Sequence, residues 1–346
     1  MPPEFAVSPL SVIHAANRDP RWLAFLARQR PTLFQSPDWA GLIQEVYGFP
    51  ARVALAFEGD QLVGGLPYSE IDDFRGRRRV VGAFADVCEP LGDERAWLAI
   101  ERALVSDGIP WQIRSRTVPS AGSQPASTTC VHQRIELPRT LEEAEQNCDR
   151  KQRTKVRYAV RAGVTTRRID DAAALDVFYL LHSRTRKEKH RLLPQPRRFF
   201  EAIARRFFPE RGFVLVAELE GKVLATELMI ACGDTLYFKF IASDIDALAY
   251  KPNDLLMWKA IESAIEMGFR RIDLGISEAD SLIQFKRKFG AVDEPVYVGR
   301  YNSGEKTAAT AALERALAGV TEALTQPEVP LSAVQAGGDA LYQFFV

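Results

Sequence analysis

Positive charge concentrates in one stretch of the sequence, from Arg150 to Arg191. The stretch holds thirteen Lys or Arg residues and four acidic residues, a net charge of +9 in a chain with 45 basic and 45 acidic residues overall. Its most basic part, KQRTKVRYAVR, places Arg153, Arg157 and Arg161 four residues apart, on one face of a predicted helix. Such a stripe attracts phosphate groups, although a plain solvated surface helix is the alternative.

Aromatic residues are sparse in this basic stretch, which argues against a platform that stacks the bases of single-stranded nucleic acid. We therefore predict binding of discrete phosphates, on a nucleotide, a lipid carrier, a coenzyme or a tRNA end. The basic residues that we assign to phosphate binding are Lys151, Arg153, Arg157, Arg161, Arg184 and Arg186.

A second possible anion site lies at the start of a predicted helix, 253–267. The segment YKPND precedes this helix, and its proline suits the first helical turn. The free backbone N–H groups of a first turn can bind an anion, although Asn253 or Asp254 could simply cap the helix. Lys251 and Asn253 join the predicted binding residues, as do Tyr237 and Lys239 on the preceding predicted strand.

The segment RIDLGISEADSLIQFKRKFGA, residues 271–291, combines an acid and a lysine with apolar residues. Asp273 interrupts an apolar strand, where it could act in chemistry or only make a local hydrogen bond. Lys286 lies in a short predicted helix between Phe285 and Phe289, which are four residues apart and pack inward. It is either a functional cation or a lysine that extends from the edge of the core to solvent.

Two hairpins place these residues in a repeated framework. VALAFEGDQLVGGLPY, from Val53, and VLVAELEGKVLATELM, from Val214, each read as a strand, a turn with glycine and a second strand. A predicted helix precedes each hairpin, over 38–47 and 196–208. Helix followed by hairpin therefore occurs twice, with an offset of 162 residues between Gly59 and Gly221, which indicates an internal duplication.

The other predicted elements complete two α/β halves. Residues 120–129 read as a loop, residues 305–324 as an alanine-rich helix and residues 325–338 as a loose segment. Further helices are predicted over 94–105, 140–149, 151–162, 171–191 and 282–289, and further strands over 111–116, 134–137, 235–241, 271–275 and 296–301.

Length and composition limit the class of protein. A chain of 346 residues suits two domains of roughly 130–170 residues each. The four cysteines have no metal-ligand or redox spacing, so we expect reduced thiols and no metal. Residues 1–20 lack the pattern of a signal peptide, and no run is long and apolar enough to span a membrane, which predicts a cytoplasmic location.

The segments KQRTKVRYAVRAGV, LHSRTRKEKHRLLPQPRRFF, ALAYKPNDLLMWKAIESAIEMGFRRIDLGIS and FKRKFGA, in this order, resemble the FemAB-like branch of the GNAT acyltransferase superfamily. The resemblance covers about residues 36–301 and implies two tandem GNAT-like domains. Each would have a mixed, mostly antiparallel sheet flanked by helices, within an α/β (α+β) fold. We place them at 1–134 and 135–303, with the main site in the second, and a helical tail at 304–346.

The resemblance implies transfer of an acyl or aminoacyl group onto an amine of a phosphate-bearing cell-envelope or polysaccharide precursor. The lysine of the family's FKxxFG motif falls on Lys286, which would stabilise negative charge on the acyl oxyanion or on a substrate phosphate. The attacking amine must lose a proton. We rank Asp254 and Asp273 first among the candidate bases, ahead of Asp86, Glu89 and Asp280.

The acyl donor stays open between aminoacyl-tRNA and acyl-coenzyme A, and no tightly bound cofactor is predicted. The chain lacks the long helical arm of the bridge enzymes that add glycine, and residues 243–254 lack the glycine-rich turn of acetyl-coenzyme A GNAT domains. The alternatives are a coenzyme A-dependent N-acyltransferase on a small molecule and a non-catalytic binding protein. The expected partners are a phosphate-bearing or lipid-linked substrate and possibly tRNA, and we expect a monomer or weak dimer.

Overall fold

The structure is a computed structural model, and it describes residues 10–117, 126–171 and 173–346. It divides into two compact units. Unit 1 comprises residues 1–128, 296–306 and 346, and unit 2 comprises residues 129–295 and 307–345. These limits differ from the predicted 1–134, 135–303 and 304–346. The segment 296–306 returns to unit 1, and the tail packs with unit 2.

Unit 1 is built on a sheet with the strand order β1-β2-β3-β4-β6-β13, with the short β5 beside β3. Neighbouring strands are antiparallel except for β4 and β6, which are parallel and are connected through helix α3. The strands are β1 (Ser11–Ala16), β2 (Ala51–Glu58), β3 (Gln61–Asp73), β4 (Gly76–Val81), β5 (Leu91–Gly92), β6 (Trp111–Ser115) and β13 (Val292–Tyr301).

Helices of unit 1 cover both faces of β3. They are α1 (Pro20–Leu26), α2 (Pro37–Tyr47) and α3 (Glu94–Ser106). A Cβ on Gly64 would lie 2.6 Å from Cβ of Ala96 in α3, and a Cβ on Gly65 would lie 2.6 Å from the Trp22 ring in α1. Because consecutive strand residues point to opposite faces, this glycine pair lets two helices approach the strand closely from both sides.

Unit 2 repeats the plan of unit 1. Its sheet order is β8-β9-β10-β11-β12-β7, again with a single parallel pair, β11 and β12, which helix α8 connects. The sixth position differs, because β7 precedes the rest of unit 2 in the chain whereas β13 follows it. The strands are β7 (Ala126–Glu136), β8 (Thr165–Ile169), β9 (Gly212–Leu219), β10 (Lys222–Cys232), β11 (Thr235–Ser243) and β12 (Arg271–Ser277).

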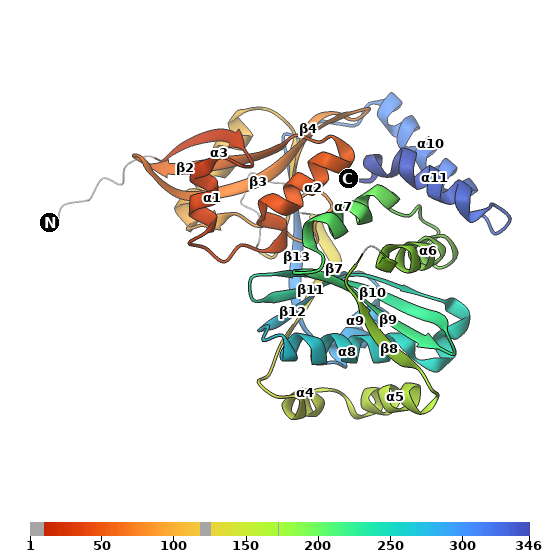
Figure 1. Cartoon of the computed structure of the whole chain (residues 1–346). Coiled ribbons are helices and arrows are strands. Elements are labelled where there is room, and N and C mark those ends of the chain that lie inside the picture. The colour runs from red at the N-terminus through yellow and green to blue at the C-terminus, as the bar shows by residue number, and fades with distance from the viewer. Residues whose placement is uncertain (1–9, 118–125, 172) are drawn as a thin grey trace. The chain divides into compact units, whose positions relative to one another are not determined.

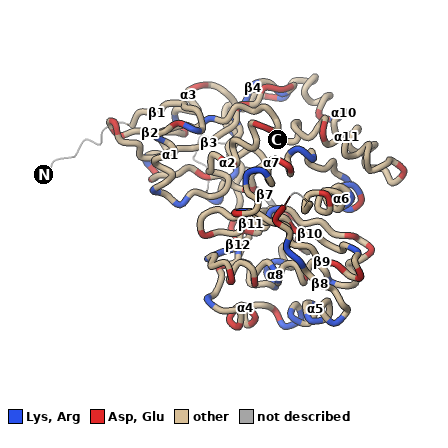
Figure 2. The backbone as a smooth tube through the Cα atoms, viewed as in Figure 1, with Lys and Arg blue, Asp and Glu red and all other residues tan. Residues whose placement is uncertain are grey.

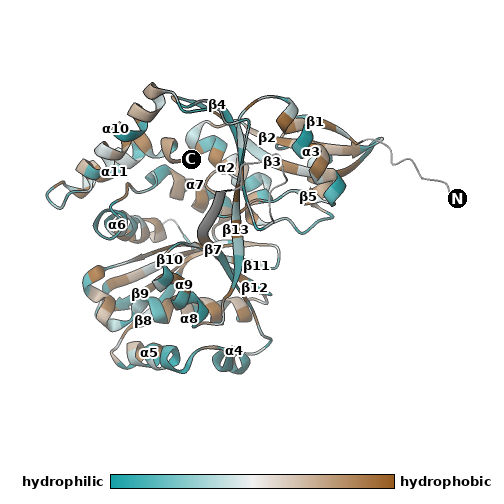
Figure 3. Ribbon diagram, turned by 180° about the vertical axis from the view of Figure 1, so that it is seen from behind, coloured by the Kyte–Doolittle hydropathy of each residue, from teal (hydrophilic) through white to brown (hydrophobic). Residues whose placement is uncertain are grey.

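The helices of unit 2 form layers on the two faces of this sheet (Figure 1). Helices α6 and α7 lie on one face, α8 lies on the other, and α4 and α5 lie outside α8. Figure 3 shows α5 as mainly hydrophilic, as expected for an outermost helix. The helices are α4 (Leu141–Asn147), α5 (Arg150–Arg161), α6 (Ala173–Glu188), α7 (Arg197–Phe207), α8 (Pro252–Glu266) and α9 (Asp280–Arg287).

Both predicted hairpins form, but their structural offset is 161 residues rather than 162. The turn residues are Gly59 and Asp60 in the first hairpin, and Glu220 and Gly221 in the second. The first turn has positive φ at Gly59, which suits glycine at its first position. The second has positive φ at both positions, with glycine at the second. An alignment that matches Gly59 with Gly221 is therefore one residue away from the alignment of the two turns.

The tail contains two helices, α10 (Ala308–Leu324) and α11 (Leu331–Leu341). The predicted loose segment 325–338 is therefore wrong for its second half. A Cβ on Gly338 would lie 2.3 Å from the carbonyl oxygen of Pro194, so close packing on unit 2 compensates for the low helix propensity of this glycine. The predicted fold, a mixed and mostly antiparallel α/β arrangement with helices, is confirmed.

Further predictions of elements need correction. Strands β1, β4, β5 and β8 were not predicted, and β7 begins at Ala126, inside the predicted loop 120–129. Residues 120–125 of that loop lie outside the described part of the chain. Strands β4 and β8 contain arginines, at 77–79 and 167–168, which obscure the alternation typical of a half-buried strand.

One carboxyl group lies inside the apolar core of unit 2. Glu227, in β10, is 0% exposed and lies between Leu215 of β9 and Ile241 of β11. Within the described chain neither carboxyl oxygen has a hydrogen-bond partner. Burial raises the pKa of Glu227 well above its usual range, so the folded state holds it as a neutral acid.

We predict that Glu227→Gln removes a pH dependence of stability. Above pH 4.5 the unfolded chain releases the Glu227 proton that the folded chain keeps, so the wild type loses stability as pH rises. The difference in unfolding free energy between variant and wild type should grow by up to about 1.4 kcal/mol per pH unit. Urea unfolding at several pH values measures it. Glu220→Gln, at an exposed turn, is the control, and an equal pH dependence for both variants would contradict the prediction.

Candidate functional site

A bulge in β12 organises the polar residues of unit 2. Asp273 pairs with Arg134 of β7, and Ile276 pairs with His132, so Leu274 and Gly275 together face only Gln133. Gly275 has a φ of +66°, a conformation that favours glycine. Because a bulge interrupts the ladder of backbone hydrogen bonds, the Leu274 carbonyl is available to a side chain.

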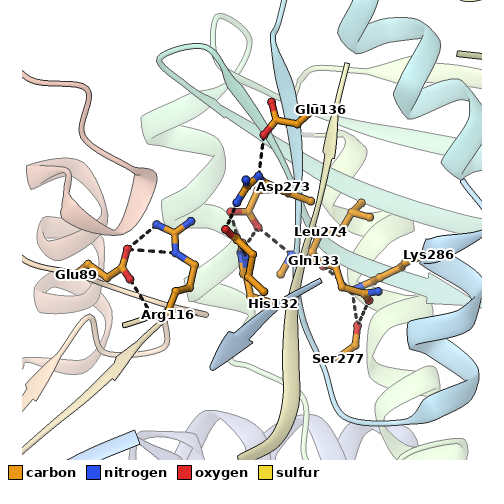
Figure 4. Close-up of polar contacts among 12 residues, drawn as sticks. Glu89, Arg116, His132, Gln133, Glu136, Asp273, Leu274, Ser277 and Lys286 are labelled. Carbon is orange, nitrogen blue, oxygen red and sulfur yellow. Dashed lines mark hydrogen bonds and ion pairs between the residues drawn. The ribbon is translucent and has the colours of Figure 1, made fainter. Parts of the chain in front are cut away.

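Lys286 uses that carbonyl. Its Nζ donates to the Leu274 oxygen at 2.6 Å and to Ser277 Oγ at 2.8 Å, and the residue is 4% exposed (Figure 4). Ser277 Oγ in turn donates to Gln133 Oε1 at 2.9 Å. Lys286 is therefore a buried cation with defined acceptors, and not a lysine that extends to solvent. The alternative of a solvent-seeking lysine is wrong for this position.

Asp273 is bound to the same bulge from the other side. Its Oδ1 accepts from the Gly275 backbone N–H at 2.8 Å. Both carboxylate oxygens lie 3.1 Å from Nε2 of His132, and Nδ1 of His132 lies 3.2 Å from Glu294 Oε2. His132 is 1% exposed. Asp273 and Lys286 thus contact adjacent residues of one bulge (Figure 4).

Charged residues continue the network on both sides. Arg134 donates to Glu294 and, at 2.7 Å, to Glu136, and its hydrogen bond to Glu294 raises the pKa of Arg134. On the other side, Gln133 Nε2 donates to Asp293 at 2.8 Å, and Asp293 also pairs with Arg287. Each buried charge near the bulge is therefore paired or hydrogen-bonded, as a stable site requires.

His132 and Gln133 were not predicted from the sequence to be site residues. Their contacts reach residues more than 140 positions away, such as Asp273 and Ser277, so no local spacing predicts them. The available signal was the polar run HQR inside the otherwise apolar end of β7. A buried polar residue in a strand needs a partner, and that requirement indicates a site.

A second group of predicted residues meets at the start of α8. Lys251 has a φ of +59° and precedes Pro252, the first residue of the helix. Asn253 Oδ1 accepts from Ser243 Oγ at 2.7 Å. Lys251 and Asn253 are both half-buried, and Asn253 binds the end of β11.

Asp254 links this helix start to α5. Gln152, which is fully buried, donates to its Oδ1, and Lys155 Nζ lies 3.7 Å from the same oxygen. Burial raises the pKa of Asp254, and the charge of Lys155 opposes this shift. Asp254 is therefore suited to hold or accept a proton, but its contacts are with α5 whereas those of Asp273 are with β7.

The basic residues of α5 point mainly to solvent. The helix buries Gln152, Val156 and Ala159, and the opposite face is exposed and carries much of the positive charge (Figure 2). Lys151 and Arg161 are exposed, Arg153 is half-buried, and Arg157 pairs with Glu145 at 2.6 Å. The predicted stripe is thus an open surface rather than the lining of a pocket.

Two basic residues of α6 hold the tail instead of a ligand site. Arg186 Nε donates to the Leu193 carbonyl at 3.0 Å, and its guanidinium lies 6.0 Å from the centre of the Tyr342 ring. Lys187, 7% exposed, donates to the carbonyl oxygens of Pro327 at 3.1 Å and Val329 at 2.6 Å. The contacts of Arg186 therefore do not support its predicted role in phosphate binding. Arg184 differs, because it is at the surface and pairs with Glu188.

Tyr237 and Lys239 lie where β11 separates from β12. The parallel pairing of these strands joins Thr235–Tyr237 to Arg271–Asp273 and ends there. Tyr237 is buried and is the register partner of Asp273, and Lys239 is the bulged residue of β11 opposite β10. The point of separation therefore adjoins the Asp273 end of the bulge.

A cavity of about 240 Å³ opens between β7, α4, α8 and the turn after α9. Glu136, Asn147 and Phe289 are among its lining residues. Glu136 connects it to the charged network through Arg134. In the described residues no group of three or more His, Cys, Asp or Glu side chains could hold a metal ion, and no helix could cross a membrane.

Comparisons with known proteins agree with this architecture. Residues 146–287 match the acetyltransferase (GNAT) domain family. A UDP-N-acetylmuramoylpentapeptide-lysine N(6)-alanyltransferase from Weissella viridescens is 27% identical over 153 residues, 43% of this chain and 45% of that protein. The match thus spans less than half the length of this curated relative.

Two solved structures extend the likeness over both units. The crystal structure of FemX has a TM-score of 0.61 at 14% identity, covering 88% of this chain and 99% of FemX. The chain therefore has the tandem GNAT fold. A tandem GNAT protein from the clavulanic acid biosynthesis pathway, with a TM-score of 0.53 at 12% identity, covers 86% of this chain and 100% of its own. The GNAT family match includes β12 and α9, and so Lys286 and the strand bulge, but not β7 with His132 and Gln133.

The packing of the tail should depend on Lys187. Lys187→Met keeps the length of the side chain but removes both hydrogen bonds to the turn before α11. We expect faster amide hydrogen exchange in residues 331–341 and a loss of about 1–3 kcal/mol in unfolding free energy. Lys189→Met, at an exposed position of the same segment, is the control. Equal exchange in both variants would show that Lys187 does not hold the tail.

Proposed function

We propose that this protein transfers an acyl or aminoacyl group onto an amine of a phosphate-bearing cell-envelope or polysaccharide precursor. The observation that carries the proposal is the buried Lys286 ammonium, held 2.6 Å from the carbonyl of a strand bulge. The W. viridescens relative is an alanyltransferase of a UDP-linked muropeptide lysine, which supports an aminoacyl group, a lysine-type acceptor and a phosphate-bearing substrate.

The chemistry requires few groups. The acceptor amine attacks the donor's ester or thioester carbonyl, the new C–N bond forms, and the bond to the leaving oxygen or sulfur breaks. The carbonyl oxygen carries negative charge in between, and a preorganised cation stabilises it in a site of low water content. Lys286 is such a cation, and the proton lost by the amine ends on the leaving group.

Asp273 is the better candidate for the base. It contacts the same bulge as Lys286, whereas the contacts of Asp254 lie at the junction of α5 and α8. A carboxylate bound to the same bulge can accept the amine proton while the lysine stabilises the oxyanion. The exposed basic face of α5, together with Arg184, Lys239, Lys251 and Asn253, stays a predicted surface for substrate phosphates or for tRNA. The cytoplasmic location likewise stays a prediction.

Lys286→Met tests the proposed cation. The substitution keeps most of the side-chain volume and removes the charge, so kcat should fall about 10²–10³-fold, as for the loss of one oxyanion donor. Transfer to a UDP-linked muropeptide is measured with aminoacyl-tRNA and, separately, with acyl-coenzyme A, which also identifies the donor. Lys288→Met, exposed on the same helix turn, is the control. Equal turnover by both variants would exclude Lys286 from the reaction.

Asn substitutions compare the two candidate bases. Asp273→Asn should lower kcat about 10²–10⁴-fold, the usual contribution of a general base, and Asp254→Asn should have a much smaller effect. Single-turnover kinetics at saturating donor measure the chemical step. The reverse order of effects would place the base at the start of α8 instead.

A further inference from the structure

The bulge of β12 connects two buried networks through adjacent residues. Lys286 binds the carbonyl of Leu274, and Asp273 accepts from the N–H of Gly275. The peptide unit between Leu274 and Gly275 contains both groups, since it joins that carbonyl to that N–H. Any rotation of this one peptide unit therefore changes both contacts together.

His132 contacts the Asp273 carboxylate, which in turn accepts from this peptide unit. Its Nε2 lies 3.1 Å from each Asp273 oxygen, and the ring is nearly fully buried in β7. On the other side of the ring, Nδ1 lies 3.2 Å from Glu294 Oε2, and Glu294 itself accepts from Arg134. The imidazole is thus restrained on both nitrogens, and it restricts rotation of the Asp273 side chain about χ1 and χ2.

We propose that His132 is a positioning residue for Lys286, acting through Asp273 and the Leu274–Gly275 peptide. The inference rests on the proposed function for its catalytic meaning, but the positioning itself is a property of the folded chain. His132 fixes Asp273, Asp273 fixes the peptide, and the peptide carbonyl fixes the ammonium. Catalytic groups need placement to within a fraction of an ångström, so loosening this chain of contacts lowers turnover without removing any reacting group.

Two isosteric substitutions separate this role from mere packing. The amide nitrogen of glutamine reaches about as far along the side chain as Nε2 of histidine, and that of asparagine about as far as Nδ1. His132→Gln therefore keeps a donor toward Asp273 and loses the contact with Glu294. His132→Asn does the reverse. Glutamine is also closer to histidine in volume, so packing is controlled with His132→Leu, which fills a similar space without a donor and should label like His132→Asn.

His182 offers a matched control in the same unit. It is 4% exposed, its Nε2 lies 2.8 Å from Gln195 Oε1, and it stacks on Phe178 in α6, on the opposite face of the sheet from α8. His182→Gln thus removes a buried imidazole of equal burial without touching β12. Gly275→Ala, at a φ of +66°, disturbs the bulge directly and serves as a positive control.

The primary measurement needs no substrate. The full-length chain is treated briefly with N-hydroxysuccinimidyl acetate, and acetylation of Lys286 is quantified by peptide mass spectrometry against that of exposed Lys288. We expect labelling of Lys286 to rise about tenfold in His132→Asn, from loss of a hydrogen bond to a charged group, and in Gly275→Ala. His132→Gln and His182→Gln should stay within about twofold of wild type.

Turnover gives the second measurement. In His132→Asn we expect kcat to fall about 10²-fold with little change in KM, and His132→Gln should recover most of it. Equal Lys286 labelling in His132→Asn and His182→Gln, or unchanged labelling in Gly275→Ala, would overturn the proposal. If His132→Asn does not fold, unchanged labelling in Gly275→Ala would still overturn the proposal. If even the wild type transfers nothing, the proposed function fails, while the labelling result continues to test the positioning.

Discussion

A buried ammonium ion must replace its hydration shell with protein acceptors, and this requirement shapes the second unit. Desolvating a charge costs several kcal/mol unless polar groups compensate. For Lys286 the compensation comes from the Leu274 carbonyl, which a regular ladder between β12 and β7 would have used for a backbone hydrogen bond. The bulge is therefore the means by which the sheet gives up a backbone acceptor to a side chain. The glycine at 275 follows from the same need, because the bulge requires positive φ there.

The two units show how one plan supports different roles. In each, a hairpin leads through a strand and a helix to a parallel strand, β6 or β12. At the positions of Gly64 and Gly65 in the first copy, the second copy has Ala225 and Thr226, given the structural offset. In the first copy the glycines let two helices pack closely on the strand. In the second copy a buried acid, Glu227, directly follows Thr226. Within the described residues the lysine at a strand bulge belongs to the second copy.

The features that were predictable from sequence are those set by neighbours in the chain. Both hairpins, the basic helix and the helix at Pro252 follow from periodicity, turn residues and helix-terminal proline. The burial of Lys286 beside Phe289 was visible as a possibility in the same way. What local patterns could not show is which partner satisfies each polar group. Arg186 was predicted to bind phosphate, but its guanidinium lies over Tyr342 of the tail, more than 150 positions later in the chain. His132 was missed for the same reason.

The division of β13 between the units has a consequence for how the chain is made. Residues 296–301 complete the sheet of unit 1 beside β6, and the Tyr301 ring stacks on Trp111 with centres 3.8 Å apart. Tyr301 also bonds Glu101, 200 positions earlier. At about 5–20 residues per second, a ribosome needs about 10–40 s to add that much chain. Throughout that interval β6 has an open edge, so unit 2, although later in sequence, has all its strands synthesised before unit 1 does. During synthesis the first unit therefore depends on the nascent chain staying unaggregated, a vulnerability that a simple tandem of contiguous domains would not have.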